Sequence, residues 1–182
     1  FAEHGVKVKG LELDLGQMMK RKDKVVKSNN DGIVYLFKKN KINFFPGTGS
    51  FGKSPSQIMV GDETLQARHV IVATGSKPRA LPGAEFDEKL ILSNTGALAM
   101  GEVPKRLGVI GAGIIGLEMG SVWRRLGSEV TILEALPAFL GIADDTVARE
   151  AGKVFARQGL KIELGVKIGS VEKKKTVKVQ YT

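Results

Sequence analysis

The chain has 182 residues, of which 42% are hydrophobic and 26% charged, with 23 glycines and 6 prolines; this composition is typical of an α/β protein and excludes a disordered one. Cysteine is absent, which excludes a disulfide framework, a thiolate metal site and a cysteine nucleophile within this chain. The net charge is +9, but the basic residues are scattered in short groups, which favours solvated faces over a nucleic-acid surface. Because no apolar run reaches about 18 residues and no signal pattern opens the chain, we predict neither a membrane span nor export.

The first part of the chain predicts a long helix followed by short strands. Apolar residues recur near helical spacing from Asp14 to about Lys41, with Asp14 suited to cap the start and the triplet 30–32 a candidate break. We expect strands at Lys41–Phe45, Gln57–Val60 and His69–Ala73, with a turn at 61–63. The last of these is so apolar that we predict a fully buried strand.

A stretch with two prolines and a glycine, Lys77–Gly83, indicates a domain crossover, and we place the boundary near residue 76. Beyond it, strands and helices alternate as in a mononucleotide-binding βαβ unit with a parallel sheet. The expected elements are a strand at 107–110, a helix at 114–126 ended by Gly127, a strand at 129–134, a helix at 145–158 ended by Gly159, and strands at 161–164, 167–172 and 176–181.

A G-x-G-x-x-G motif, formed by Gly111, Gly113 and Gly116, lies directly between a predicted strand and a predicted helix. The first glycine allows a tight turn, the second lets the backbone approach a pyrophosphate, and the third lets the helix pack closely on the strand. The free N–H groups at the start of the helix would face the phosphates. A glycine-rich turn in an unrelated α/β unit is the alternative, and the surrounding strand–helix–strand pattern argues against it.

Glu134 ends the next predicted strand and follows Gly111 by 23 residues, close to the spacing of an acid that hydrogen-bonds the hydroxyls of a ribose. A carboxylate there would repel a 2′-phosphate, and residues 135–138 contain no arginine to bind one. We therefore predict NAD rather than NADP.

Two further loops are weaker candidates for contact with a ligand. Residues 73–76, Ala-Thr-Gly-Ser, follow the apolar run, and the loop 47–52 contains closely spaced glycines. Glycine and small hydroxyl residues let a backbone approach a ligand, but they also form ordinary turns. Neither loop decides a function by itself.

The motifs together resemble one family. They are the glycine motif continued by Leu117–Gly120, the run Ser121–Val130, Glu134, Ala73–Ser76 and Thr95–Leu98. In this order the chain, from Phe1 to Thr182, resembles the dihydrolipoamide dehydrogenase family of flavoprotein pyridine nucleotide-disulfide oxidoreductases. Since the chain begins without methionine and ends inside a predicted strand, we expect an internal segment of a longer protein.

The resemblance implies an α/β fold with a Rossmann-like NAD-binding domain and part of a homologous FAD-binding domain. Residues 1–76 would belong to the FAD-binding domain and 77–182 to the NAD-binding domain, truncated at its C-terminal end. FAD would be contacted by Gly49, Thr74, Gly75 and Ser76. NAD would be contacted by Gly111, Ala112, Gly113, Ile114, Ile115, Gly116, Leu117, Glu118, Glu134 and Ile168. Of these, Glu118 would lie where the nicotinamide approaches the flavin; the alternative, which we consider weaker, is a carboxylate favoured there only by the helix dipole.

The resemblance also implies an activity for the intact protein: oxidation of protein-bound dihydrolipoamide by NAD⁺ through FAD and a redox disulfide outside this chain. The chain alone is not expected to be catalytic, and no metal is predicted. Its partners would be a dihydrolipoamide-bearing acyltransferase or a glycine-cleavage carrier protein, in a homodimer located in the cytoplasm, or in the mitochondrial matrix of a eukaryote. Alternatives are a flavin-dependent NADH oxidase or transhydrogenase, or a non-enzymatic nucleotide-binding module.

Overall fold

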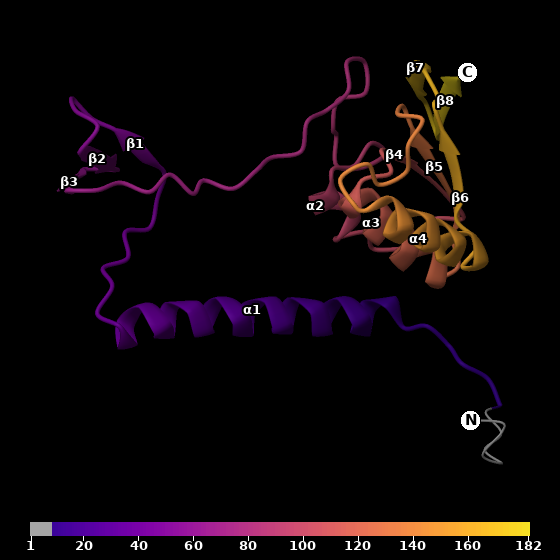
Figure 1. Ribbon diagram of the computed structural model, residues 1–182. Helices are drawn as coiled ribbons and strands as arrows, with labels where there is room; N and C mark the ends of the chain where they lie inside the picture. The colour runs from indigo at the N-terminus through magenta and orange to yellow at the C-terminus, as the bar shows by residue number, and fades with distance from the viewer. Residues whose placement is uncertain (1–8) are drawn as a thin grey trace. The chain divides into compact units, whose positions relative to one another are not determined.

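The computed structural model describes residues 9–182, which divide into two compact units. One unit comprises residues 9–19 and 78–182, and the other comprises Lys20–Lys77. Figure 1 labels their elements. The division between Lys77 and Pro78 falls in the proline-containing stretch, while the assignment of the two parts to FAD- and NAD-binding domains stays a prediction.

Helix α1, Leu15–Lys39, begins with a side-chain cap, because Asp14 Oδ1 accepts a hydrogen bond of 2.8 Å from the N–H of Gln17. The predicted break at residues 30–32 is wrong, since the helix runs through them without interruption. One glycine inside a helix costs only about 1 kcal/mol, which the regular turns on both sides outweigh. An ion pair of 2.6 Å between Lys27 Nζ and Asp31 Oδ2 spans one turn at this point.

The strands of the smaller unit form an antiparallel meander, and only one of them matches an expected strand. Its members are β1, Gly49–Phe51, β2, Gln57–Val60, and β3, Glu63–Gln66, in the order β1-β2-β3. The predicted strand at 41–45 is absent from the structure: this stretch is irregular. The ring of Phe44 contacts that of Phe37, with centroids 5.6 Å apart, so side-chain packing against the helix replaces strand pairing here.

The predicted buried strand His69–Ala73 is also wrong. Residues 70–80 are irregular, and Ile71 is 91% exposed and Val72 66%. A strand buried on both faces needs neighbouring strands that accept and donate its backbone hydrogen bonds. Among residues 9–182, no strand pairs with this stretch, so its apolar sequence has nothing to pack against.

The larger unit is built on a parallel sheet, which confirms the α/β class. The elements are α2, Asn94–Ala97, β4, Arg106–Ile110, α3, Ile114–Arg125, β5, Glu129–Glu134, α4, Asp145–Arg157, β6, Lys161–Leu164, β7, Ile168–Lys173, and β8, Val177–Tyr181. Strands β4, β5 and β6 are parallel and adjacent in that order, and β7 and β8 form a separate antiparallel hairpin. The short helix α2 was not predicted; it is capped by the hydroxyl of Ser93.

Both long helices of this unit contribute to one core on a single face of the sheet. Val130 and Ile132 alternate along β5 and are fully buried, and their partners in register on β4 are Leu107 and Val109. Leu117 from α3 and Phe155 from α4 pack against this cluster. A parallel sheet crossed by helices on one face is the arrangement that successive βαβ units produce.

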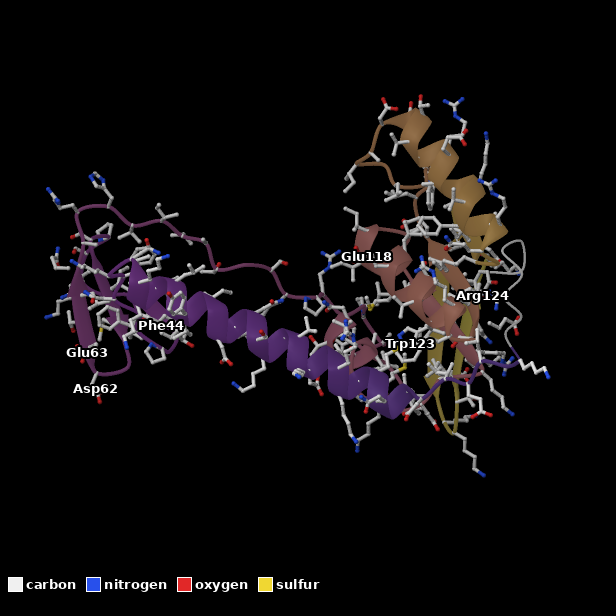
Figure 2. The ribbon with its side chains drawn as sticks, turned by 90° about the horizontal axis from the view of Figure 1, so that it is seen from below. Phe44, Asp62, Glu63, Glu118, Trp123 and Arg124 are labelled. Carbon is white, nitrogen blue, oxygen red and sulfur yellow. The ribbon has the colours of Figure 1, made fainter. Side chains whose placement is uncertain are left out.

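Hydrogen bonds at the ends of the helices join the layers. The indole N–H of Trp123 donates to the carbonyl of Ala97, which connects α3 with α2, and Arg124 Nε donates to the carbonyl of Gly159 beyond α4. Figure 2 shows both side chains on α3. Gly127 and Gly159 take positive φ angles of 114° and 83°, which lets the chain leave each helix and enter the next strand.

The loop before α2 is attached to the β7–β8 hairpin by one carboxylate. Asp87 Oδ1 accepts hydrogen bonds from the N–H groups of Lys89, Leu90 and Ile91, and its Oδ2 lies 2.7 Å from Lys173 Nζ. The Lys173 ammonium, followed by these backbone N–H groups, holds the pKa of the Asp87 carboxyl well below its usual range.

A buried and an exposed isoleucine test the core assignment. Ile132→Ala should lower the free energy of unfolding by about 2–5 kcal/mol, because it removes packed atoms and leaves a cavity at a residue that is 0% exposed. Ile142→Ala is the matched control, since Ile142 is 82% exposed, and should change it by less than about 0.5 kcal/mol. Urea unfolding of the full-length protein measures both, and equal effects would contradict the described core.

The Asp87 contacts predict a pH dependence. A pKa that is lower in the folded than in the unfolded protein stabilises the fold at any pH above the unfolded value of about 3.9, and this contribution disappears as the pH falls further. Asp87→Asn should therefore destabilise the protein at pH 6, and the difference from wild type should shrink as the pH is lowered toward 3. Thermal unfolding across this range measures it, with the exposed Asp62→Asn as control. A difference that is constant with pH would refute this role of the carboxylate.

Candidate nucleotide-binding site

The turn from β4 to α3 is shaped by its glycines. Gly111 has a φ of +105°, and its N–H donates a hydrogen bond of 2.7 Å to the carbonyl of Leu133 in the neighbouring strand. The carbonyl of Gly113 then accepts the N–H of Leu117 at 3.0 Å, which begins the helix. The chain thus passes from strand to helix within three residues.

Gly116 makes the contact that brings helix and turn together. A Cβ atom added there would collide with the carbonyl oxygen of Gly111 and would lie 3.3 Å from Val109 Cγ1. Only glycine lets α3 lie this close to the end of β4. The close contact at Gly116 therefore fixes the position of α3 relative to the end of β4.

Gly113 has the opposite surroundings. It is the N-cap of α3, its φ of −75° is open to any residue, and a Cβ added there would meet nothing within 4 Å. No side chain caps the helix, so its first N–H groups are not covered by one. A helix N-terminus with free N–H groups attracts an anionic group such as a pyrophosphate.

Glu134, at the carboxyl end of β5, lies beside the turn. Its Oε2 accepts a hydrogen bond of 2.7 Å from the N–H of Ala112, and its Oε1 accepts one of 2.9 Å from the N–H of Leu136. The side chain is half-buried. A carboxylate is thus held against the glycine turn at the end of the adjacent strand.

A glycine turn open beside Gly113, a helix N-terminus and an acid on the next strand are the parts of a dinucleotide site. The model of the pyridine nucleotide-disulphide oxidoreductase family matches residues 2–182. The chain belongs to this family. The match covers both units and confirms the resemblance drawn from the motifs.

Relatives of known name support the same family. The chain is 53% identical over its whole length to a dihydrolipoyl dehydrogenase of Cupriavidus necator, of which it spans 39%. It is 48% identical over 94% of its length to a leghemoglobin reductase of Vigna unguiculata, spanning 34% of that protein, and 47% identical over 92% to a mitochondrial dihydrolipoyl dehydrogenase of Schizosaccharomyces pombe, again spanning 34%. The chain therefore corresponds to between a third and two fifths of the relatives it matches.

Solved structures show the same fold. The protein LpdA of Mycobacterium tuberculosis aligns with a TM-score of 0.81 and 24% identity, over 94% of this chain and 40% of that one. The HOCl-induced flavoprotein disulfide reductase RclA of Escherichia coli aligns with a TM-score of 0.77 and 26% identity, over 92% of this chain and 39% of that one.

The residues predicted to contact NAD differ in how exposed their side chains are. Ala112 and Leu117 are 2% and 3% exposed, so their side chains belong to the core. Ile114 and Ile115, in the first turn of α3, are exposed, and so is Glu118, which Figure 2 shows on α3. Contact of these residues with NAD stays a prediction.

The residues just before Ile168 are hydrogen-bonded to the carboxyl end of β5 and the loop that follows it. The N–H of Val166 donates a hydrogen bond of 3.0 Å to the carbonyl of Glu134, and the N–H of Gly165 donates one to the carbonyl of Leu136. Two residues further on, Ile168 begins β7 and pairs with Tyr181. Its backbone therefore follows a segment that is bonded to the end of β5.

The predicted FAD residues lie in the smaller unit. Gly49 begins β1 and pairs with Val60, whereas Thr74, Gly75 and Ser76 belong to the irregular, exposed stretch after β3. Gly75 has a φ of +76°. Contact of these residues with flavin also stays a prediction.

Sequence reasoning missed the N–H of Leu136, which holds one oxygen of Glu134. Every residue except proline carries this donor, so no side-chain signal marks it.

The described residues form neither a metal site nor a membrane-spanning helix. Within residues 9–182, no group of three or more histidine, aspartate or glutamate side chains could hold a metal ion. Over the same range, no helix has the length and apolar character needed to cross a membrane.

Two glycines of the motif allow a test that separates folding from binding. Gly116→Ala should destabilise the fold by about 2 kcal/mol or more, because the new Cβ collides with backbone. Gly113→Ala should cost less than about 1 kcal/mol, since its Cβ projects into open space. Chemical denaturation without nucleotide measures both, and a Gly116→Ala protein as stable as Gly113→Ala would contradict the described contact.

Proposed function

We propose that the protein containing this chain is a dihydrolipoyl dehydrogenase, which oxidises protein-bound dihydrolipoamide with NAD⁺ through FAD and a redox disulfide outside this chain. The observation that carries the proposal is 53% identity, across the whole chain, to the Cupriavidus necator protein of that name. The open glycine turn with an acid on the next strand supports it independently.

Residues 77–182, the predicted NAD-binding domain, would bind NAD. Gly111, Gly113 and Gly116 would shape the turn for the pyrophosphate, and Glu134 would accept the ribose hydroxyls. Residues 114–118 would continue the surface along α3, with Glu118 toward the nicotinamide, and the backbone of Ile168 would face the adenine. When bound, FAD and NAD supply the electron and hydride chemistry, and the chain holds and orients them.

Residues 1–76 would belong to the FAD-binding domain, with Gly49 and residues 74–76 against the flavin cofactor. The intact protein would be a homodimer. Its partner would be a dihydrolipoamide-bearing acyltransferase or a glycine-cleavage carrier protein, in the cytoplasm or, in a eukaryote, in the mitochondrial matrix. The relatives named as mitochondrial support the second location for eukaryotic members.

The full-length protein tests the activity. Purified protein should show a bound flavin spectrum and should form NADH when given dihydrolipoamide and NAD⁺. A flavoprotein that oxidises NADH but does not accept electrons from dihydrolipoamide would overturn the proposal.

A second candidate is a flavoprotein that passes electrons from NADH to another protein. It is favoured by the 48% identity to leghemoglobin reductases, whose name states a haem protein as acceptor. Rates of NADH consumption with a ferric haem protein, compared with rates of NADH formation from dihydrolipoamide, distinguish the two.

The ribose assignment gives a prediction on cofactor choice. Glu134→Arg should weaken NADH binding about 10- to 100-fold, because a charged hydrogen-bond acceptor is lost, and should improve NADPH binding relative to NADH because arginine binds the 2′-phosphate. Fluorescence titration of the full-length protein with each nucleotide measures the ratio. Equal weakening for both nucleotides would refute the role of Glu134 in reading the ribose.

A further inference from the structure

The carboxylate of Glu134 already has two partners before any nucleotide is considered. One oxygen bonds the N–H of Ala112, 22 residues away in the glycine turn, and the other bonds the N–H of Leu136 in its own loop. The 2.7 Å bond to Ala112 has the length of a charge-assisted hydrogen bond. Glu134 thus joins the end of β5 to the centre of the turn.

We propose that Glu134 is a positioning residue for the glycine turn, which it holds in the phosphate-binding shape before the nucleotide arrives. This role is separate from contact with the ribose. It rests on the proposed function only in taking the turn as the place where the pyrophosphate binds.

The turn needs such a bond because its own residues are free to move. Ala112 is flanked by Gly111 and Gly113, the residue type that loses most conformational freedom on ordering. Ala112 is only 2% exposed, so its N–H would lack a partner if the carboxylate were removed. An unpaired N–H in a buried residue favours rearrangement of the turn.

The two roles are compatible in one side chain. Each oxygen of an ionised carboxylate can accept more than one hydrogen bond. The ribose hydroxyls can therefore donate to Glu134 while the N–H of Ala112 stays bonded. A turn held in advance costs less ordering when the nucleotide binds.

Replacing Glu134 by glutamine changes the charge and the hydrogen-bonding groups of the side chain without changing its size. Glu134→Gln keeps the length of the side chain, but one of its two terminal atoms becomes an NH₂ donor. The amide oxygen can accept from Ala112 or from Leu136 but not from both, so Glu134→Gln can keep the bond to the turn. Glu134→Ala removes both acceptors and is therefore the deciding variant. The matched control is Glu129→Ala, at the opposite, exposed end of the same strand, which removes the same charge.

Hydrogen exchange in the nucleotide-free, full-length protein tests the first part. The N–H of Ala112 should exchange about tenfold faster in Glu134→Ala than in wild type or Glu129→Ala, with exchange of the core residue Ile132 unchanged. Unchanged exchange at Ala112 would overturn the proposal. Faster exchange throughout the sheet would overturn it too, because the effect would then be on the fold as a whole.

A binding cycle tests the second part. NADH and its analogue lacking both the 2′- and the 3′-hydroxyl of the adenosine ribose are titrated into wild type and Glu134→Ala. If Glu134 also positions the turn, the substitution should weaken binding of this dideoxy analogue about tenfold. If it only reads those hydroxyls, the affinity for the analogue stays unchanged, and the proposal fails. Should wild type bind neither nucleotide, the proposed function fails, whereas the exchange experiment still decides the positioning role.

Discussion

The contact between the backbone of Gly116 and the carbonyl of Gly111 is the constraint on which the nucleotide site depends. It lets α3 start directly after the end of β4, and so places the uncapped N-terminus of the helix at the carboxyl end of that strand. The same closeness places Leu117 in the core with Val130 and Ile132. A side chain at 116 would move the helix outward and disturb both. Core packing and the shape of the site therefore share one cause.

The groups offered to a ligand at this turn belong mainly to the backbone, and the side chains on either side serve packing. Relatives named for different substrates, dihydrolipoyl dehydrogenases and leghemoglobin reductases, match this chain at 44–53% identity. A site made of main-chain N–H groups recognises the phosphates common to all pyridine nucleotides. The residues that distinguish these substrates are thus expected elsewhere in the family's longer chains.

Local signals were sufficient where an element and its partners lie close in sequence. Alternation, capping and glycine stops act over a few residues. They were sufficient to predict the strands at 129–134 and 161–164 and the helix ends at Gly127 and Gly159. The strand predicted at His69–Ala73 failed because a buried strand needs distant neighbours. The bond from Ala112 to Glu134 was not predictable, since a backbone N–H has no signature in the sequence. The motif placed both residues at the site without showing that they bond to each other.

The order β4-β5-β6 leaves the two outer strands of the parallel sheet with one side unpaired among residues 9–182. Unpaired strand edges present rows of N–H and C=O groups that can add a strand from another molecule. Expressed by itself, this segment should therefore associate edge to edge and lose solubility at high concentration. Measurements on an isolated NAD-binding segment of this family would then be measurements on aggregates. Dilution series and light scattering are therefore the first checks on any such preparation.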